Sequence, residues 1–317
     1  MMKRRGERAY TSLRSMSTHV EITPRDTDLL QLLSWTPATT ALLYKASIAF
    51  PGGSFADERR LRERLQALAE GDLVRAFSTA NVGGGLRNYY KLTPAGWQTI
   101  NGPEKPVPTR AYFAEVPPSL FIHTFRLADV IVETYRACRA KRVIIDRFIR
   151  ENELSFKVGD NQVQPDCFFK LTARGRIFNV AFEIDNSTAS IDSYASNSIR
   201  QKLAVYDAYQ KNVLGNWLVG GKRWERPRFR VLFLTQSVER AYHILAFAAE
   251  VTSNRSRRLV YAATLDDFLS SGDPLFAPLF LDHSGHWRSL IDLHPSAEIS
   301  KTPVRLTRPV ASPLGVW

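Results

Sequence analysis

The stretch of chain whose residue types and spacing best suit a reaction site is "PDCFFKLTARGRIFNVAFEID", residues 165–185. Two apolar runs separated by Arg174 and Gly175 predict a β-hairpin with a two-residue turn. In the register that this turn sets, Asp166 lies opposite Glu183, with Cβ atoms about 4.5–5.5 Å apart. Like charges at that separation repel one another, so the pattern raises the question of what balances them.

Asp185 is two residues beyond Glu183, so it projects from the same face of the strand. Three carboxylates at one edge of a sheet offer the hard oxygen ligands that Mg²⁺ and Mn²⁺ prefer. We therefore expect Asp166, Glu183 and Asp185 to hold such an ion. Taken singly, each acid also fits a structural role at a strand start or in a turn.

A site that cleaves phosphodiester bonds also needs a cation near the attacking water or the scissile phosphate. Lys202 is our candidate, because the helix predicted at 196–212 can fold back over the sheet, and Lys202, Tyr206 and Tyr209 share one of its faces. A bound ion would polarise the phosphate and make water a better nucleophile. The expected catalytic residues are Asp166, Glu183, Lys202 and Asp185.

Two other groups of polar residues carry weaker signals. In "LDHSGHW", Asp282, His283 and His286 could hold a metal, but a polar turn is the favoured interpretation because further ligands are missing from the pattern. His123 fits a core or interface residue better than a base, and it stays a candidate because it lies beside the expected site.

The elements around this site alternate between helices and β-branched strands. We predict helices over 119–140, 196–212 and 238–252, strands over 228–237 and 258–265, and leave the type of 142–152 open. Such alternation predicts an α/β fold around a mixed sheet.

The residues before position 101 follow a different order, with three helices and then two strands. Thr23 is a predicted N-cap with Pro24 at the first helical position, and Ser54 pairs with Asp57 at the spacing of a capping box. Strands at 72–80 and 87–96 flank the glycine-rich tip "NVGGGL". This is the order of a winged helix-turn-helix.

The third helix of that unit presents a basic surface, and its leucines point to the core. Such a helix can enter a major groove, and basic residues on or beside the wing can contact flanking phosphates. The interleaved Glu58 and Glu63 also fit a plain solvated helix, and winged helices serve as protein-interaction modules too. The predicted DNA-binding residues are Arg59, Arg60, Arg62, Arg64, Gln66, Arg75 and Arg87.

Proline-rich stretches mark the expected domain boundaries. We predict a basic N-terminal arm, a winged helix-turn-helix domain, a linker, an α/β domain and a C-terminal tail. Their expected bounds are 1–20, 21–100, 101–118, 119–292 and 293–317.

Composition narrows the class of protein. The 317 residues are 44% hydrophobic and carry a net charge of +12, which favours a polyanionic partner such as double-stranded DNA. No apolar run is long enough to span a bilayer or to resemble a signal peptide. Cys138 and Cys167 lie far apart, so no disulfide framework is indicated. We expect a soluble cytoplasmic protein with no membrane partner, associated with the nucleoid or a plasmid.

The spacing from Pro165 and Asp166 to "EID" at 183–185 resembles the PD-(D/E)XK motif of restriction-endonuclease-like nucleases. Together with the winged helix, "FEIDNST" and "KLAVYDAY", it resembles the replication-relaxation family, associated with plasmid replication and DNA relaxation. The resemblance implies a restriction-endonuclease-like α/β domain after the winged helix. Asp185 stands where the motif has lysine. Lysine displaced to the next helix is a known variation, which suits Lys202, but the same departure fits a member that binds DNA without cutting it.

Three functions follow as hypotheses. The first is a plasmid or mobile-element protein whose second domain nicks or cleaves DNA with Mg²⁺ or Mn²⁺. The second is a non-catalytic DNA-binding factor that recruits replication or transfer proteins. The third is a winged-helix transcription regulator with a sensory domain. A homodimer is compatible with each.

Overall fold

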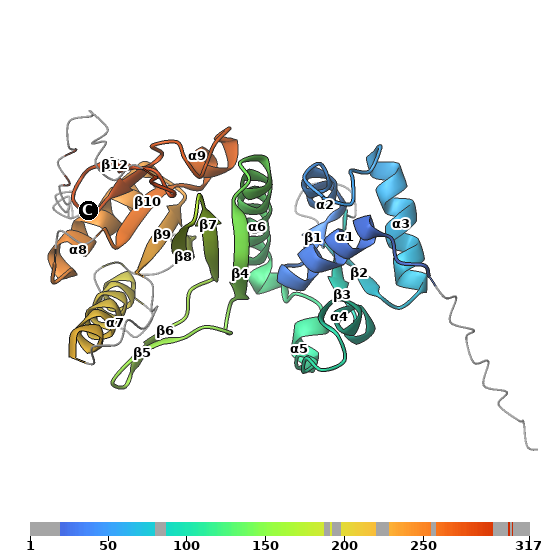
Figure 1. Cartoon of the computed structure of the whole chain (residues 1–317), viewed down its shortest axis with the longest axis horizontal. Coiled ribbons are helices and arrows are strands. Elements are labelled where there is room, and N and C mark those ends of the chain that lie inside the picture. Colours follow the sequence, from blue (N-terminus) through green and yellow to red (C-terminus); the bar gives the residue numbers. More distant parts are fainter. Residues whose placement is uncertain are drawn as a thin grey trace, which may run out of the picture.

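The computed structural model describes residues 20–79, 87–186, 191, 198–219, 228–254, 258–293, 304 and 306. These residues form a smaller unit with a three-stranded sheet and a larger unit with a seven-stranded sheet (Figure 1). The predicted basic arm up to residue 19, the glycine-rich tip and nearly all of the predicted C-terminal tail lie outside the described residues. The architecture is the mixed α/β class expected from the sequence.

The smaller unit, here the winged-helix unit, has the predicted order of three helices and a hairpin. Its sheet order is β1-β3-β2, with both pairings antiparallel. A further helix, α4, follows the hairpin where the sequence pattern indicated only strand. The elements are α1 (Pro24–Trp35), β1 (Ala38–Thr39), α2 (Thr40–Ser47), α3 (Glu58–Glu70), β2 (Val74–Thr79), β3 (Arg87–Leu92) and α4 (Pro94–Asn101).

Helix caps explain where α1 and α3 begin. Thr23 caps α1 as predicted, and Asp26 completes a capping box with it. The Ser54 cap is wrong, because the Asp57 carboxylate accepts the backbone N–H of Arg60 at 2.8 Å and α3 starts directly after it.

The predicted linker is not free of structure. It contains α5 (Arg110–Phe113) and leads into the 3-10 turn η1 (Pro118–Leu120). The Tyr112 hydroxyl donates to the Ser34 carbonyl at 3.0 Å, so this stretch packs against α1. The domain boundaries themselves remain predictions.

The larger unit, here the α/β unit, is built on the sheet β12-β11-β10-β9-β8-β7-β4. Strands β8, β9 and β10 run parallel, and β4, β7 and β8 are antiparallel. Helices and strands alternate around a mixed sheet, as the sequence pattern predicted. The elements are α6 (Phe121–Ala140), β4 (Ile144–Arg150), β5 (Phe156–Val158), β6 (Asn161–Val163), β7 (Cys167–Ala173), β8 (Arg176–Asp185), α7 (Ile199–Val219), β9 (Phe229–Thr235), α8 (Val238–Val251), β10 (Val260–Thr264), α9 (Leu265–Ser270), β11 (Phe280–Asp282) and β12 (Trp287–Arg288).

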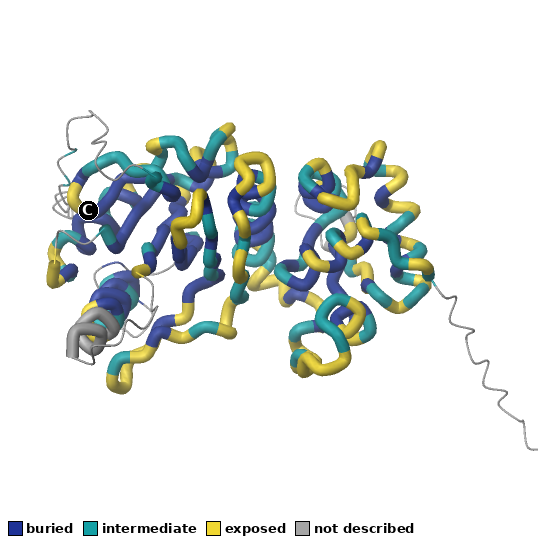
Figure 2. Tube along the Cα trace, viewed as in Figure 1, coloured by how far each residue is buried: buried dark blue, intermediate teal, exposed yellow. Residues whose placement is uncertain are grey.

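Helices cover both faces of the large sheet, and its central strands are buried (Figure 2). Phe169 and Phe182 pack toward α6 and α9, whereas Ala181 and Phe233 pack toward α7 and α8. This alternation follows from the period of two along each strand. Among the described helices, none combines the length and apolar character needed to cross a bilayer.

The two units share one hydrophobic core across α6 and β4. Trp35 of α1 stacks on Phe148 of β4 with ring centroids 4.9 Å apart, and Lys45 of α2 pairs with Glu133 of α6 at 2.8 Å. Helix α6 therefore lies between the two sheets as a packed layer (Figure 1). These contacts hold the winged-helix unit against the α/β unit.

Candidate functional site

The β7–β8 hairpin has the register predicted from its turn. Ala173 pairs with Arg176, and the two residues between them, Arg174 and Gly175, have φ of 47° and 73°. Positive φ at both central positions is what a two-residue hairpin turn requires. The register carries the first acid, Asp166, to the open end of the hairpin.

Asp166 is buried just before β7 and is tied to β8. Its backbone N–H donates to the Phe182 carbonyl at 3.0 Å, and its Oδ2 accepts the backbone N–H of Ile184 at 2.6 Å. Its other oxygen, Oδ1, lies 3.3 Å from Nε2 of His123. The strand pairing therefore places Asp166 beside Glu183, as expected.

Glu183 is 2% exposed and has a partner on each carboxylate oxygen. Lys202 Nζ lies 2.5 Å from Oε2, and the Tyr206 hydroxyl donates to Oε1 at 2.6 Å. Burial raises the pKa of Glu183, and the neighbouring Asp166 adds to that rise while Lys202 opposes it. The predicted fold-back of the helix that carries Lys202 is thus present in α7.

Lys202 is the cation among these acids. Burial alone would lower its pKa, but the charges of Glu183 and Asp166 outweigh burial, and the net direction is upward. Its ammonium group therefore stays charged and can offset negative charge next to Asp166.

Asp185 has a different partner from the other two acids. Arg240 of α8 donates to it through two nitrogens, at 2.6 Å from Nε and 3.1 Å from the terminal nitrogen. Such a two-point pair holds both oxygens of the carboxylate. Asp185 thus lies on the same strand end as Glu183, but its oxygens face an arginine.

A group that the hairpin pattern did not predict adjoins Asp166. One ligand atom each from His123, Glu151 and Asp166 lie within 4.8 Å of one another. The hydrogen bond to Asp166 raises the pKa of His123, and burial together with the Asp166 charge raises the pKa of Glu151. Shifted pKa values of several neighbouring groups are typical of functional sites.

Strand β4 explains why Glu151 lies there. Arg150, the last residue of β4, pairs with Cys167, the first residue of β7. The residues just outside the two strands, Glu151 and Asp166, are therefore neighbours at the sheet end. Sequence reasoning missed Glu151 because it left the type of 142–152 open. An antiparallel strand there would have predicted the row Glu151, Asp166 and Glu183.

His123 is held from its other side. Its Nδ1 lies 3.2 Å from the Asn186 amide nitrogen, and Arg126 donates to the Asn186 carbonyl oxygen at 2.6 Å. The ring therefore points its Nε2 at the acids, and the prediction that His123 lies beside the site is confirmed.

A cavity of about 210 Å³ leads to these acids from the side of the winged-helix unit. Trp35 and Lys91 of the winged-helix unit, Tyr112 of α5, and Glu151 and Asp166 line it. The site is thus open along the junction between the two units.

The donor set fits a divalent cation. Asp166 and Glu183 supply hard oxygens at adjacent strand ends, and His123 with Glu151 extends the set on the other side of Asp166. Asp185 fits less well in this conformation, because a cation would have to displace the two-point contact from Arg240.

The basic residues of α3 fall into two groups. Arg59, Arg60 and Arg62 expose 78%, 66% and 60% of their side chains, and their ion pairs within the described part of the chain are with Glu58 or Glu63 at the surface. Exposed pairs of this kind contribute little to stability. These three arginines are therefore available for phosphates or base edges.

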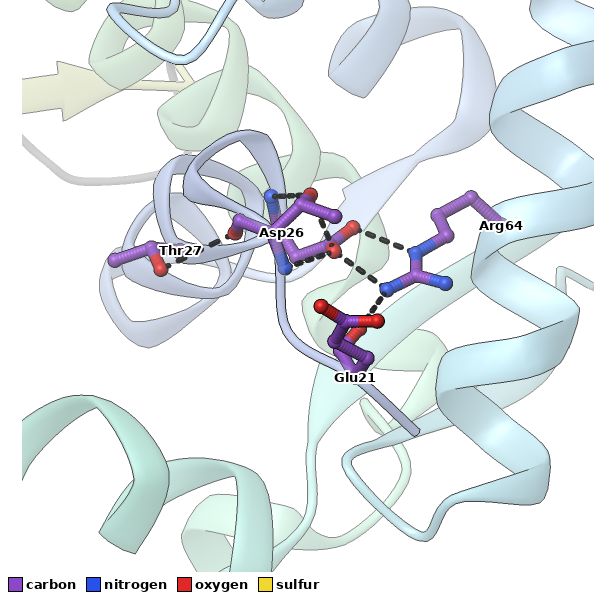
Figure 3. A network of polar contacts seen from close by, with 5 residues as sticks. Glu21, Asp26, Thr27 and Arg64 are labelled. Atoms are coloured by element: carbon purple, nitrogen blue, oxygen red, sulfur yellow. Dashed lines mark hydrogen bonds and ion pairs between the residues drawn. The ribbon is translucent and has the colours of Figure 1, made fainter. Parts of the chain in front are cut away.

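Arg64 belongs to the fold instead. Its guanidinium contacts both oxygens of Asp26, at 2.8 Å and 2.6 Å, and donates to the Glu21 carbonyl at 2.5 Å (Figure 3). The Asp26 side chain is 1% exposed and also completes the α1 capping box. A DNA contact by Arg64 would have to break this network.

The remaining predicted DNA-binding residues are placed only in part. Gln66 is on α3, where its amide donates to Glu70 at 3.0 Å, and Arg75 is exposed on β2. Arg87 begins β3, but its side chain lies outside the described residues.

The residues of "LDHSGHW" form a polar turn, as favoured from the sequence. Asp282 accepts the backbone N–H groups of Ser284 and His286 at 2.9 and 3.0 Å, and Arg288 donates to its second oxygen at 2.8 Å. The carboxylate is engaged by its own turn and by β12.

Comparisons with solved structures give distant likenesses. The restriction endonuclease FokI matches with 9% identity and a TM-score of 0.26, and FokI bound to DNA with 13% identity and a TM-score of 0.26. Each match covers 79% of this chain and 44% of the endonuclease chain, so the chain spans less than half the length of these enzymes. Curated protein sequences give no match.

The family comparison covers both units. The model described as "Replication-relaxation" matches residues 32–216, which is more than half of the chain. The matched range runs from α1 through α7 and includes the acids of the hairpin end and Lys202. The family match indicates a DNA-related function. The chain belongs to the replication-relaxation family.

Proposed function

We propose that this protein is a plasmid or mobile-element endonuclease that nicks or cleaves DNA with a divalent cation. The observation that carries the proposal is the meeting of Asp166, Glu183 and Lys202 at one end of the β7–β8 hairpin. Two carboxylates from adjacent strand ends and a charged lysine from α7 support the proposal, with Lys202 taking the part of the lysine that the PD-(D/E)XK motif has at position 185.

Each residue has a defined part in this proposal. Asp166 and Glu183 would hold Mg²⁺ or Mn²⁺, which when bound polarises a phosphate and activates water. Lys202 would share Glu183 with the cation and offset charge that develops on the phosphate. Tyr206 fixes the second oxygen of Glu183, so the carboxylate keeps its orientation.

The winged-helix unit would bring double-stranded DNA to this site. The exposed Arg59, Arg60 and Arg62 of α3 supply donors for phosphates and guanine edges. Packing through α6 and β4 fixes the distance between this helix and the acids. A location at the nucleoid or on a plasmid follows from the same proposal.

A second candidate is a DNA-binding factor without nuclease activity. It is favoured by one observation: protein donors engage both oxygens of Glu183 and both oxygens of Asp185. In that case the ion pairs hold the hairpin end together, and replication or transfer proteins would be the partners.

A supercoiled plasmid assay decides between the two. The full chain should nick the plasmid only with Mg²⁺ or Mn²⁺, and Asp166→Asn, Glu183→Gln and Lys202→Met should each lower the rate by at least about 100-fold. DNA affinity in a gel-shift assay should stay the same.

Matched controls are Asp160→Asn, in the exposed turn between β5 and β6, and Lys170→Met, in the middle of β7. Both should keep the wild-type rate. A wild-type chain that binds DNA but never nicks it, or activity that survives all three site substitutions, would overturn the proposal.

A further inference from the structure

We propose that His123, Glu151 and Asp166 form a divalent-cation site that prefers a transition metal such as Mn²⁺ over Mg²⁺. One ligand atom of each lies within 4.8 Å of the other two, and His123 Nε2 approaches Asp166 Oδ1 to 3.3 Å. The inference rests on the proposed function for the use of the cation, but binding of the cation can be measured without it.

The partners of the acids direct a cation to this side of Asp166. Lys202 and Tyr206 engage both oxygens of Glu183, and Oδ2 of Asp166 accepts from Ile184. Oδ1 of Asp166 faces His123 instead. Among the described contacts, no lysine or arginine approaches this oxygen as closely as Lys202 approaches Glu183. The described geometry therefore offers an imidazole and two carboxylates rather than a pure carboxylate set.

Backbone positions support a built site. Glu151 directly follows β4 and Asp166 directly precedes β7, and the last pair of these antiparallel strands, Arg150 with Cys167, places the two acids side by side. His123 comes from the first turn of α6, which is packed between the two units. Side chains held on rigid elements give a cation a site of defined size.

The imidazole carries the metal preference. Mg²⁺ demands oxygen ligands in near-ideal octahedral geometry, whereas divalent transition metals accept imidazole nitrogen readily. An all-carboxylate pair at Asp166 and Glu183 would not make this distinction. The nitrogen ligand from His123 therefore distinguishes the site at His123, Glu151 and Asp166 from a site formed by Asp166 and Glu183 alone.

The second ring nitrogen also has a partner. The Asn186 amide lies 3.2 Å from Nδ1, and Arg126 holds the Asn186 oxygen. A cation on Nε2 requires a proton on Nδ1, so the amide must turn its oxygen to the ring. A carboxylate at this position would accept that proton directly, as the partners of metal-binding histidines commonly do.

Access to the site comes from the junction of the units. The cavity of about 210 Å³ is lined by Glu151 and Asp166 together with Trp35 and Lys91 of the winged-helix unit. A cation can therefore reach Asp166 through this cavity.

The test is direct titration of the full chain without DNA. Free Mn²⁺ is followed by electron paramagnetic resonance, and Mg²⁺ is added as the competitor. Wild type should bind Mn²⁺ more tightly than Mg²⁺, and His123→Ala and Glu151→Gln should each weaken Mn²⁺ binding by about tenfold or more. Glu153→Gln, two residues beyond Glu151 and exposed, is the matched control and should bind as wild type does.

Two further variants keep the test independent of folding damage. Asn186→Asp should tighten Mn²⁺ binding, and His123→Asp should keep a ligand but reduce the preference for Mn²⁺ over Mg²⁺. Thermal melts by circular dichroism confirm that each variant is folded. Unchanged Mn²⁺ binding in His123→Ala and Glu151→Gln, or equal binding of both ions by wild type, would overturn the inference.

The plasmid assay separates this inference from the proposed function. Nicking with Mg²⁺ that persists in His123→Ala leaves the nuclease proposal intact and removes the transition-metal site. Tight Mn²⁺ binding without any nicking keeps the site and removes the nuclease.

Discussion

Two buried carboxylates, one in each unit, are each paired with a cation on a neighbouring helix, but their pKa values are shifted in opposite directions. Asp26 is paired with Arg64 of α3, and Glu183 with Lys202 of α7. Burial opposes ionisation of Asp26, but hydrogen bonds from Arg64 and Thr23 outweigh it and lower its pKa. Burial of Glu183 prevails over Lys202, and its pKa is raised.

Burial is the largest cause of the raised Glu183 pKa, and a second acid adds to it. Asp26 accepts from Arg64, Thr23 and its own helix start, so every contact favours the charged carboxylate. Glu183 has Asp166 beside it, and the two negative charges disfavour each other. In a structural ion pair, each charge is compensated by its partner. Crowded like charges that the fold retains instead indicate a site that binds a ligand.

Among these predictions, Glu183→Gln should have the largest effect on activity. Nicking should fall by at least about 100-fold, because the amide is neutral and a poor ligand for a divalent cation. The raised pKa means that the ionised Glu183 carboxylate is disfavoured in the folded state, which offsets part of the cost of leaving Lys202 with Asp166 alone. The melting temperature should therefore fall less than in an Arg64 variant. Plasmid nicking and thermal unfolding on one preparation measure both. A melting temperature that falls as far as in an Arg64 variant would make Glu183 structural.

Arg64→Ala should give the reverse pattern. Removal of the guanidinium leaves Asp26 buried and uncompensated, which should cost about 3 kcal/mol of unfolding free energy. Arg62→Ala on the same helix is the control and should change stability by less than about 0.5 kcal/mol. Urea denaturation measures both variants. A cost equal to that of Arg62→Ala would mean that the Asp26 pair does not serve the fold.

Acid should remove the stabilisation that Asp26 supplies. Its folded-state pKa lies below the ordinary value of 3.8, so its contribution is present above 3.8 and is lost as the pH falls through the folded-state value. The difference in unfolding free energy between wild type and Asp26→Asn should be constant above about pH 5 and shrink below 3.8. Urea melts across this pH range test the sign. A difference that grows on acidification would contradict the lowered pKa.

Arg62→Ala should have the smallest effect on stability of these variants, but it should weaken DNA binding. Arg62→Ala leaves the fold intact but removes one exposed donor from α3. DNA affinity should fall, and the slope of log affinity against log salt should flatten by about 1. Gel shifts at several salt concentrations measure this slope. An unchanged slope would remove α3 from the proposed DNA surface.

The sequence predicted the parts of the fold that depend on local chemistry. Thr23 capped its helix and the Arg174 turn set the hairpin register, because both features rest on a few adjacent residues. It misplaced the start of α3, where Ser54 and Asp57 offer competing caps. The short strands β5 and β6 and the helix α5 were missed, since elements of three or four residues carry too little periodicity.

The candidate site was predicted only where sequence spacing determines it. Asp166, Glu183 and Lys202 follow from one hairpin and the next helix, and they meet as expected. The two-point contact of Asp185 with Arg240 and the approach of Glu151 were not predictable from spacing, because both depend on pairing between distant segments. Long-range packing also reassigns Arg64 from the DNA surface to the fold.

The measurement that tests the central claim most directly is anomalous diffraction from crystals of the full chain grown with Mn²⁺. The account predicts an anomalous peak within about 2.0–2.6 Å of a carboxylate oxygen of Asp166, the range of oxygen ligands to divalent cations. Asp26, whose oxygens are held by Arg64 and Thr23, should show none. Absence of a peak at Asp166 in crystals that bind Mn²⁺ elsewhere would contradict the claim that the end of the β7–β8 hairpin is a cation-dependent site.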